Sequence, residues 1–152
     1  MTPSPSGVRS VLGPDEPAWR RLWDGYLTFY GVALDAGTTD DTWRRLLDPD
    51  SAMQGVVAER DGRLAGFALY LLHEGSWSRR PTCHLEDLFV APDARRQGVG
   101  RSLIGHLADL GRAQGWSSIY WHTQATNARA RRLYDTIGTT EGFVRYRLPI
   151  LS

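Results

Sequence analysis

Hydrophobic residues recur along the chain with periods of two and of three to four, and these periods predict its strands and helices. A long amphipathic helix is expected after Asp15 and Glu16, whose negative charges suit a helix N-terminus. Its apolar positions, spaced by three and four, are Trp19, Leu22, Trp23, Tyr26, Phe29 and Tyr30. A second, shorter helix is expected after Asp40-Asp41 and ends at Asp48-Pro49.

Strand-like segments occupy much of the remaining chain. Residues 8–12 predict a first strand, and residues 56–58 and 64–72 predict a hairpin that turns at Asp61-Gly62. Further strands are expected at residues 82–90, 118–123 and 142–149. A helix that ends near Gly115 follows the strand at 82–90. A short helix capped by Asn127 and ended by Gly138 follows the strand at 118–123.

Residues 85–110 carry the arrangement that binds phosphate groups in many proteins. An apolar strand is followed by a turn, by Arg95, Arg96 and Arg101 around Gly98 and Gly100, and then by an amphipathic helix. Backbone N–H groups in the first turn of a helix have no partners within the helix, so they can bind a phosphate. Glycine lets a diphosphate approach the backbone, and arginine supplies forked donors to its oxygens. The spacing matches neither GxxxxGK[ST] nor GxGxxG with a distant acid.

The segment Arg95-Arg96-Gln97-Gly98-Val99-Gly100 resembles the [RQ]xxGx[GA] signature of the GNAT N-acetyltransferases, whose loop holds the diphosphate of coenzyme A. The order β-α-α-β-β-β-α-β-α-β also matches the GNAT fold. The segments LEDLFV, RRQGVG and NARARRLY most resemble the branch that contains diamine acetyltransferases and the yeast-type histone and polyamine acetyltransferases. The resemblance implies an α/β (α+β) fold with a mixed, mostly antiparallel sheet, flanked by helices and splayed at the central strand.

We expect residues 1–7 to form a flexible tail and residues 8–152 to form a single acetyltransferase domain. The resemblance implies acetyl-CoA as the co-substrate and places its pantetheine arm along the free edge of the strand at Leu88, Phe89 and Val90. It implies diphosphate contacts from the loop residues Arg95, Arg96, Gln97, Gly98, Val99, Gly100 and Arg101. It also matches Asn127 to a residue that touches the pantetheine arm, and Tyr134 to the tyrosine that faces the thioester sulfur.

Acetyl transfer to an amine requires a group that removes a proton, because an alkylammonium with a pKa near ~10 cannot attack a thioester. The resemblance assigns this role to Glu86; the alternative is a buried structural acid. Asp87 is expected on the opposite face of the strand and in a structural role, unless a β-bulge shifts the register. Tyr134 is expected to stabilise the leaving thiolate, with core packing as its alternative.

The aromatic residues of the first helix leave two interpretations open. Tyr26 and Tyr30 either pack in the core or form a wall of the acceptor site. Cys83 is interpreted as a core residue, because no suitably placed histidine and acid would activate it as a nucleophile. His84, His106 and His122 lack the spacing of metal ligands, so no metal is expected.

The composition of the chain limits the classes of partner that we expect it to bind. A net charge of +1 is too small for the electrostatic footprint of a nucleic-acid-binding protein. The sequence contains neither a membrane-spanning apolar segment nor the apolar core of a signal peptide, so we expect a cytoplasmic protein. The lone cysteine excludes an intrachain disulfide framework. A homodimer is among the assemblies that we expect.

The acceptor is the least constrained part of the interpretation. The acids of the LED triplet favour a small, cationic, polyamine-like amine, which Glu86 would help to bind and deprotonate. A protein lysine side chain, an amino acid, an arylamine and an aminoglycoside remain open. The alternative of a different class is a non-catalytic module that binds acetyl-CoA. The retention of both Glu86 and Tyr134 favours the enzyme.

Overall fold

A computed structural model describes residues 7–151, and residues 1–6 and 152 lie outside the described part. The chain divides into two compact units, Met1–Trp121 and His122–Ser152, and we describe each by itself. The expected tail over residues 1–7 lies outside the described residues except for Gly7. The carbonyl of Gly7 accepts a hydrogen bond from the N–H of Glu59 at 2.8 Å.

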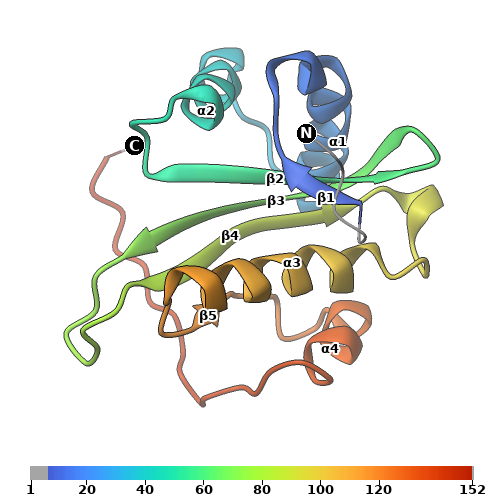
Figure 1. Ribbon diagram of the computed structural model, residues 1–152. Helices are drawn as coiled ribbons and strands as arrows, with labels where there is room; N and C mark the ends of the chain where they lie inside the picture. Colours follow the sequence, from blue (N-terminus) through green and yellow to red (C-terminus); the bar gives the residue numbers. More distant parts are fainter. Residues whose placement is uncertain (1–6, 152) are drawn as a thin grey trace. The chain divides into compact units, whose positions relative to one another are not determined.

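The first unit is built on a five-stranded sheet in the order β1-β2-β3-β4-β5 (Figure 1). The strands are β1 (Val8–Ser10), β2 (Met53–Arg60), β3 (Arg63–His73), β4 (Thr82–Val90) and β5 (Ile119–Tyr120). Neighbours from β1 to β4 are antiparallel, whereas β4 and β5 are parallel. The sheet is therefore mixed and mostly antiparallel, which confirms the predicted fold class.

The hairpin between β2 and β3 turns where the sequence predicts. Asp61 and Gly62 both have positive φ, at 53° and 74°. This backbone conformation matches the right-handed twist of the flanking strands, and aspartate followed by glycine adopts it at low cost. The turn fixes the register of β3, which in turn sets the position of β4.

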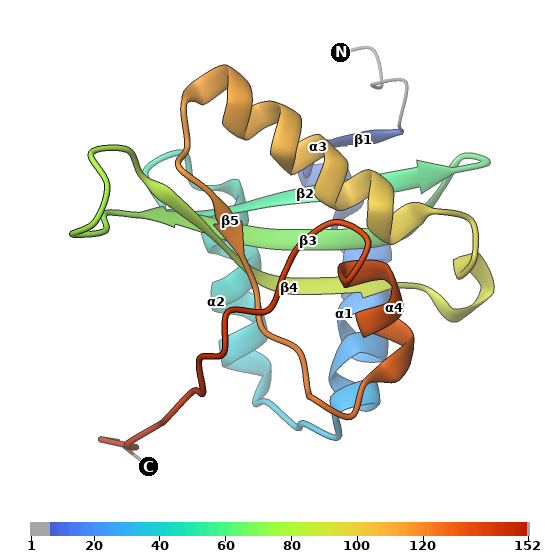
Figure 2. The same cartoon turned by 90° about the horizontal axis from the view of Figure 1, so that it is seen from below.

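Helices cover both faces of this sheet. α1 (Glu16–Tyr30) and α2 (Ala36–Leu47) lie on one face, and α3 (Val99–Gln114) lies on the other (Figures 1 and 2). Trp19 of α1 is fully buried, and its ring centroid lies 5.2 Å from those of Trp23 and Trp43. On the opposite face, α3 buries Val99, Leu103, Ile104 and Leu107. The aromatic positions predicted for the first helix thus split between this core and the site described below.

α2 begins earlier than the sequence predicts. The expected start was after Asp40-Asp41, but the helix begins at Ala36 and is capped by Asp35, whose Oδ1 accepts a hydrogen bond from the N–H of Thr38 at 2.7 Å. The first turns are polar, so hydrophobic periodicity gave no signal there. Capping by a side chain, rather than burial of an apolar face, sets this boundary.

β5 is shorter than the strand predicted at residues 118–123. Only Cys83 and His84 of β4 pair with it, opposite Ile119 and Tyr120. A β-bulge in β4 follows at once, and a bulge disrupts the regular ladder of hydrogen bonds. Within the described chain, the rest of β4 has no β-ladder partner on that side. This is the expected splay of the sheet.

The second unit contains α4 (Ala128–Tyr134). Asn127 caps it as predicted, because its Oδ1 accepts a hydrogen bond from the N–H of Ala130 at 3.2 Å. The helix ends three residues before Ile137, the last position of the predicted apolar face. The expected strand at residues 142–149 is wrong as a prediction for this chain, since the segment has no regular secondary structure. Its alternating pattern is present, but the described part of this unit offers no strand to pair with.

None of the described helices has the length and apolar character needed to cross a membrane.

Candidate active site

The β-bulge in β4 determines how the two acids of the site are presented. Leu69 of β3 pairs with Asp87 and Tyr70 pairs with Leu85, so Glu86 is the extra residue. Strict alternation would put Glu86 and Asp87 on opposite faces of the sheet. The bulge removes that alternation, and Asp87 faces α1, where its Oδ1 accepts a hydrogen bond from the hydroxyl of Tyr26 at 2.6 Å. The structural role expected for Asp87 depended on the absence of such a bulge.

Asp87 is a carboxylic acid with an unusual pKa. Burial raises this pKa from 3.8 to about 6; the hydrogen bond from Tyr26 lowers it, and the negative charge of Glu86 raises it again. A carboxylate in this range is largely ionised at pH 7 and still accepts a proton readily. Perturbed acids of this kind concentrate at functional sites. The sequence predicts a structural role for Asp87 unless a bulge shifts the register, and β4 contains that bulge.

Glu86 lies next to Asp87 but is exposed to solvent. Its Oε2 is 3.1 Å from Nδ1 of His84. The His84 ring stacks on the ring of Tyr120 with the centroids 4.7 Å apart, and the Tyr120 hydroxyl is 2.8 Å from Nε2 of His73. Glu86 is therefore an accessible negative charge that contacts His84, and the ring of His84 is held by its stacking on Tyr120.

Tyr26 and Tyr30 line the α1 side of this acid pair. Tyr26 packs against Phe67 and Phe89, with ring centroids 5.8 Å and 6.0 Å away, while its hydroxyl reaches Asp87. Burial raises the pKa of Tyr30, and the nearby charge of Asp87 raises it further. Tyr26 thus belongs both to the core and to the site, so the two interpretations of this residue are compatible.

The end of β4 supplies an open backbone edge beside the acids. Leu88, Phe89 and Val90 pair with β3 opposite Ala68, Phe67 and Gly66, and β5 does not extend to them. Phe89 turns its side chain into the core, whereas Leu88 and Val90 are half-buried. An extended ligand with amide groups can pair with such an edge as an additional strand does.

The loop after β4 ends at a helix N-terminus without a side-chain cap. Arg96 and Gly98 have positive φ, at 70° and 74°, and Gly98 is the N-cap of α3. The helical hydrogen bonds start with the N–H of Ser102, which donates to the carbonyl of Gly98 at 2.9 Å. A left-handed conformation is costly for arginine, so the loop holds Arg96 in a strained geometry of the kind found at ligand sites. Arg95 lies over the ring of Phe29, 5.7 Å from its centroid.

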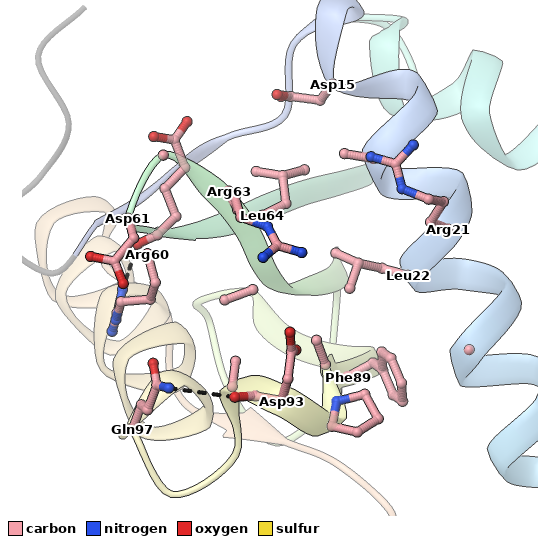
Figure 3. A pocket seen from close by; sticks show the side chains of 18 of the residues that line it. Asp15, Arg21, Leu22, Arg60, Asp61, Arg63, Leu64, Phe89, Asp93 and Gln97 are labelled. Atoms are coloured by element: carbon pink, nitrogen blue, oxygen red, sulfur yellow. Dashed lines mark hydrogen bonds between the residues drawn. The ribbon is translucent and has the colours of Figure 1, made fainter.

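A pocket of about 680 Å³ lies beside this loop, between α1 and the β2–β3 hairpin (Figure 3). Phe89 and Gln97 contribute to its wall, but neither Glu86 nor Asp87 does. Part of its polar lining is an ion-pair network in which Arg9 donates to Asp15 at 2.8 Å and also contacts Glu59. This network joins β1, β2 and the turn before α1. The pocket is therefore separate from the acid pair.

The other predicted residues fall in different environments. Asn127 uses its side-chain oxygen to cap α4, and Tyr134 is the half-buried last residue of that helix. Both belong to the second unit, so their proximity to the acids of β4 stays a prediction. Cys83 is fully buried, and burial raises the pKa of its thiol to about 12, which fits the predicted core role. Among residues 7–151, no three His, Cys, Asp or Glu side chains form a group that could hold a metal ion.

Comparisons with known proteins show the family to which the chain belongs. Residues 18–138 match the acetyltransferase (GNAT) family. The chain is 32% identical to the D-amino-acid N-acetyltransferase HPA3 of Saccharomyces cerevisiae, over 92% of this chain and 88% of the relative. It is 31% identical to the thialysine N-epsilon-acetyltransferase of Caenorhabditis elegans, over 65% of this chain and 64% of that protein.

A solved structure has the same fold. It is that of AAC(6')-Iy in complex with the bisubstrate analogue CoA-S-monomethyl-acetylneamine. The two chains superpose with a TM-score of 0.78 at 22% identity, over 94% of this chain and 97% of the other. At this identity the likeness extends to the fold alone.

Proposed function

Because the chain belongs to the acetyltransferase (GNAT) family and is an N-acetyltransferase, we propose that it transfers the acetyl group of acetyl-CoA directly to a primary amine in a ternary complex. The observation that carries this mechanism is the carboxylate of Asp87. It has a pKa of about 6 and lies beside an accessible acid and the open edge of β4. A base, a cation-binding charge and a docking edge for an acyl carrier are thus close together on one strand.

In this proposal, acetyl-CoA is bound by the end of β4 and by the loop that follows it. The pantetheine arm pairs with the edge at Leu88, Phe89 and Val90, and Asn127 adds a contact to the arm. The diphosphate binds the uncapped N-terminus of α3 and the loop side chains from Arg95 to Arg101. Helix N-termini favour anions because their N–H groups lack partners within the helix. The bound group supplies an activated thioester.

The acids Glu86 and Asp87 prepare the amine. An alkylammonium has a pKa near ~10, so its proton must leave before nitrogen can attack. Glu86, which is exposed, binds the cation and takes part in its deprotonation. Asp87, with a pKa of about 6, accepts the proton directly or through water. The carboxylates are not consumed, because the proton returns to solvent after the reaction.

The remaining chemistry stabilises charge in the thioester. The amine nitrogen forms a bond to the carbonyl carbon, and the negative charge moves to the carbonyl oxygen. A backbone N–H on the open edge near Val90 stabilises that oxygen. Collapse of the intermediate breaks the bond to sulfur while the nitrogen gives up its second proton to a carboxylate or to water. Tyr134 donates a hydrogen bond to the departing thiolate, which then takes a proton from solvent. The products are an amide and free CoA.

We propose a small, cationic, polyamine-like amine as the acceptor, with a lysine side chain as the second choice. The accessible charge of Glu86 favours a cation, and Tyr26 and Tyr30 form an aromatic wall beside Asp87. One relative is named for D-amino acids and another for thialysine, which supports an amine acceptor of low molecular mass. The proposal also includes one acetyltransferase domain over residues 8–152, acting in the cytoplasm as a homodimer.

A panel of amines tests the proposal. Purified protein is mixed with acetyl-CoA and with polyamines, D-amino acids, lysine peptides or aminoglycosides, and free CoA thiol is measured. We expect a diamine to be acetylated with a higher kcat/KM than a neutral-tailed amine of equal length. Glu86→Gln should reduce that preference while the affinity for CoA is retained. If neither protein prefers the diamine, the acceptor does not bind at Glu86.

A further inference from the structure

The pocket between α1 and the β2–β3 hairpin has the size of a small-molecule site, and the proposed reaction does not use it. Its volume of about 680 Å³ lies within the range of ligand pockets, about 300 to 1,000 Å³. Three parts of the first unit line it: the N-terminal part of α1, the hairpin around Asp61-Gly62, and the turn η2 (Pro92–Ala94) that follows β4 (Figure 3). The charges of these parts indicate which class of ligand the pocket can hold.

Two of the four arginines that line the pocket already have partners within the protein. Arg9 pairs with Asp15 and with Glu59. Arg60 donates to the carbonyl of Glu59 at 2.9 Å and to the hydroxyl of Ser102 in α3 at 3.1 Å. These two guanidinium groups therefore hold parts of the fold together and are not available to a ligand.

Arg21 and Arg63 are the two arginines that remain available to a ligand. Within residues 7–151, neither side chain makes a hydrogen bond, an ion pair or a ring contact. Arg63 extends into the pocket from the start of β3, and Arg21 comes from α1 on the other side (Figure 3). A guanidinium group presents a planar fork of donors that matches the oxygens of a carboxylate. The pocket can therefore hold an anionic group between α1 and the hairpin.

Two acids without partners balance these two arginines. Asp61 lies at the tip of the hairpin and Asp93 lies in η2, and both line the pocket. In the part of the chain that the structure describes, neither carboxylate makes a hydrogen bond or an ion pair. A ligand that is only an anion would be repelled by the acids, and a ligand that is only a cation would be repelled by the arginines. A ligand that carries both charges complements the whole set.

The pocket also has an apolar wall. Leu22 of α1 and Phe89 of β4 are buried, Leu64 of β3 is half-buried, and all three line the pocket. An apolar group of a ligand is removed from water when it packs against such a wall. Neither Glu86 nor Asp87 lines the pocket, so a ligand held there is not placed for acetylation.

We propose that this pocket is a second ligand site, separate from the site of acetyl transfer, and that it binds a zwitterionic amino acid with an apolar side chain. The carboxylate of the ligand binds Arg21 and Arg63, and its ammonium group binds Asp93. The apolar side chain packs on Leu22 and Phe89. Binding requires neither acetyl-CoA nor the acids of β4, so this site does not depend on the proposed function.

Three probes with the same phenylethyl body separate the possible classes of ligand. L-Phenylalanine is the zwitterion, phenylpropanoate carries only the carboxylate, and phenethylamine carries only the ammonium group. Each probe is titrated into the full isotope-labelled chain without acetyl-CoA, and the amide chemical shifts of residues 18–25, 60–65 and 89–97 report on the pocket. We expect L-phenylalanine to shift these amides with a dissociation constant of ~2 mM. The other two probes should bind the pocket at least ~10-fold more weakly, because each leaves one pair of charges without a partner.

Single variants test the role of each charge. Arg21→Gln and Arg63→Gln should each weaken the binding of L-phenylalanine ~10-fold. Asp93→Asn should weaken the binding of L-phenylalanine but not that of phenylpropanoate, which has no ammonium group. Arg79→Gln is the matched control, because it removes an exposed arginine outside the pocket, and it should bind L-phenylalanine as wild type does. All four side chains are exposed, so their replacement leaves the core intact.

Several results would overturn the proposal. The first is the absence of shifts at the pocket with L-phenylalanine at ~20 mM, about ten times the expected dissociation constant. The second is equal affinity for phenylpropanoate and L-phenylalanine, which would make the pocket a site for anions. The third is wild-type affinity in both Arg21→Gln and Arg63→Gln, which would place the bound probe elsewhere. These titrations measure no acetyl transfer, so their failure is distinguishable from a failure of the proposed function.

Discussion

The hydroxyl of Tyr26 donates a 2.6 Å hydrogen bond to Oδ1 of Asp87, which links the middle of α1 to the bulged part of β4. This bond stabilises the charged form of an acid that burial would otherwise keep protonated, and the resulting pKa of Asp87 is about 6. Desolvation also raises the pKa of Tyr26 strongly, so the phenol stays protonated and remains the donor. The pair therefore sets the pH range in which Asp87 can accept a proton.

The first prediction concerns the pH dependence of the reaction in Tyr26→Phe. A general base must be ionised, so kcat/KM should fall as the pH decreases through the pKa of Asp87, near 6 in wild type. Removing the phenol removes an interaction that lowers this pKa, so the acidic limb should move to higher pH. Activity above the shifted limb should change little. Tyr70→Phe is the control: it removes a hydroxyl from the opposite face of the sheet and should leave the acidic limb in place. Equal pH profiles for all three proteins would mean that Tyr26 does not influence the pKa of the catalytic base.

The second prediction concerns stability. The pKa of Asp87 is raised from 3.8 to about 6 by folding, so between these pH values the folded chain binds a proton that the unfolded chain has released. The contribution of Asp87 to the free energy of unfolding is therefore greatest at low pH and falls as the pH rises through 6. The loss is about 3 kcal/mol, from about two pKa units.

Asp87→Asn should abolish this loss. Its Tm relative to wild type should rise between pH 4 and pH 8, by an amount on the order of 10 °C for a chain of this size. Asp24→Asn is the control, because it removes an exposed carboxylate that does not contribute to the pKa shift of Asp87, so the pH dependence of Tm should stay that of wild type. Parallel Tm curves for wild type and Asp87→Asn would mean that Asp87 is not buried as an acid in solution.

The third prediction concerns the diphosphate site. Gly100 lies in the first turn of α3, where a bulky side chain would block the approach of a phosphate to the backbone. Gly100→Val should lower the affinity for CoA about 100-fold, or nearly 3 kcal/mol. Gly105→Val makes the same change at a position of α3 with open space around it, and it should bind CoA normally. Calorimetry on both folded variants measures the affinity for CoA. Undiminished affinity in Gly100→Val would refute the assignment of this loop as the diphosphate site.

The fourth prediction concerns the leaving group. Tyr134→Phe removes a hydroxyl that we expect to act on the thiolate only as the bond to sulfur breaks. It should therefore lower kcat by ~10- to 100-fold with little change in the KM for acetyl-CoA. Steady-state kinetics at saturating amine measures both constants. A near-normal kcat would return Tyr134 to a packing role in α4.

Local chemistry made much of the fold predictable. The hairpin followed from Asp61-Gly62, and the start of α4 followed from Asn127, because each of these residues imposes its geometry on the nearby backbone. The start of α2 was missed because Asp35 caps a polar turn that hydrophobic periodicity does not mark. The strand expected at residues 142–149 has the right alternation, but a strand also needs a partner, and no pattern within the segment names one.

The residues of the candidate site differ in how far the local sequence indicates their placement. Short motifs mark Glu86 and the loop around Gly98, whereas strict alternation places Asp87 opposite Glu86 unless a bulge shifts the register, and the bulge is present. Its position depends on the extra residue in β4, and its pKa depends on Tyr26, which is 61 residues away in the sequence. Long-range register and burial of this kind arise from the folded sheet and have no local sequence signal.

The most direct test of the central claim is acetyl transfer by the purified chain to a simple diamine. Wild type and the double variant Glu86→Gln/Asp87→Asn are compared at pH 8, with free CoA thiol and the acetylated amine measured together. We predict equal amounts of thiol and acetylated diamine from wild type, and at least a ~100-fold lower rate from the variant, which should still bind CoA. Tight binding of CoA by wild type without amine-dependent release of thiol would contradict the account, and it would identify the chain as a non-catalytic acetyl-CoA-binding module.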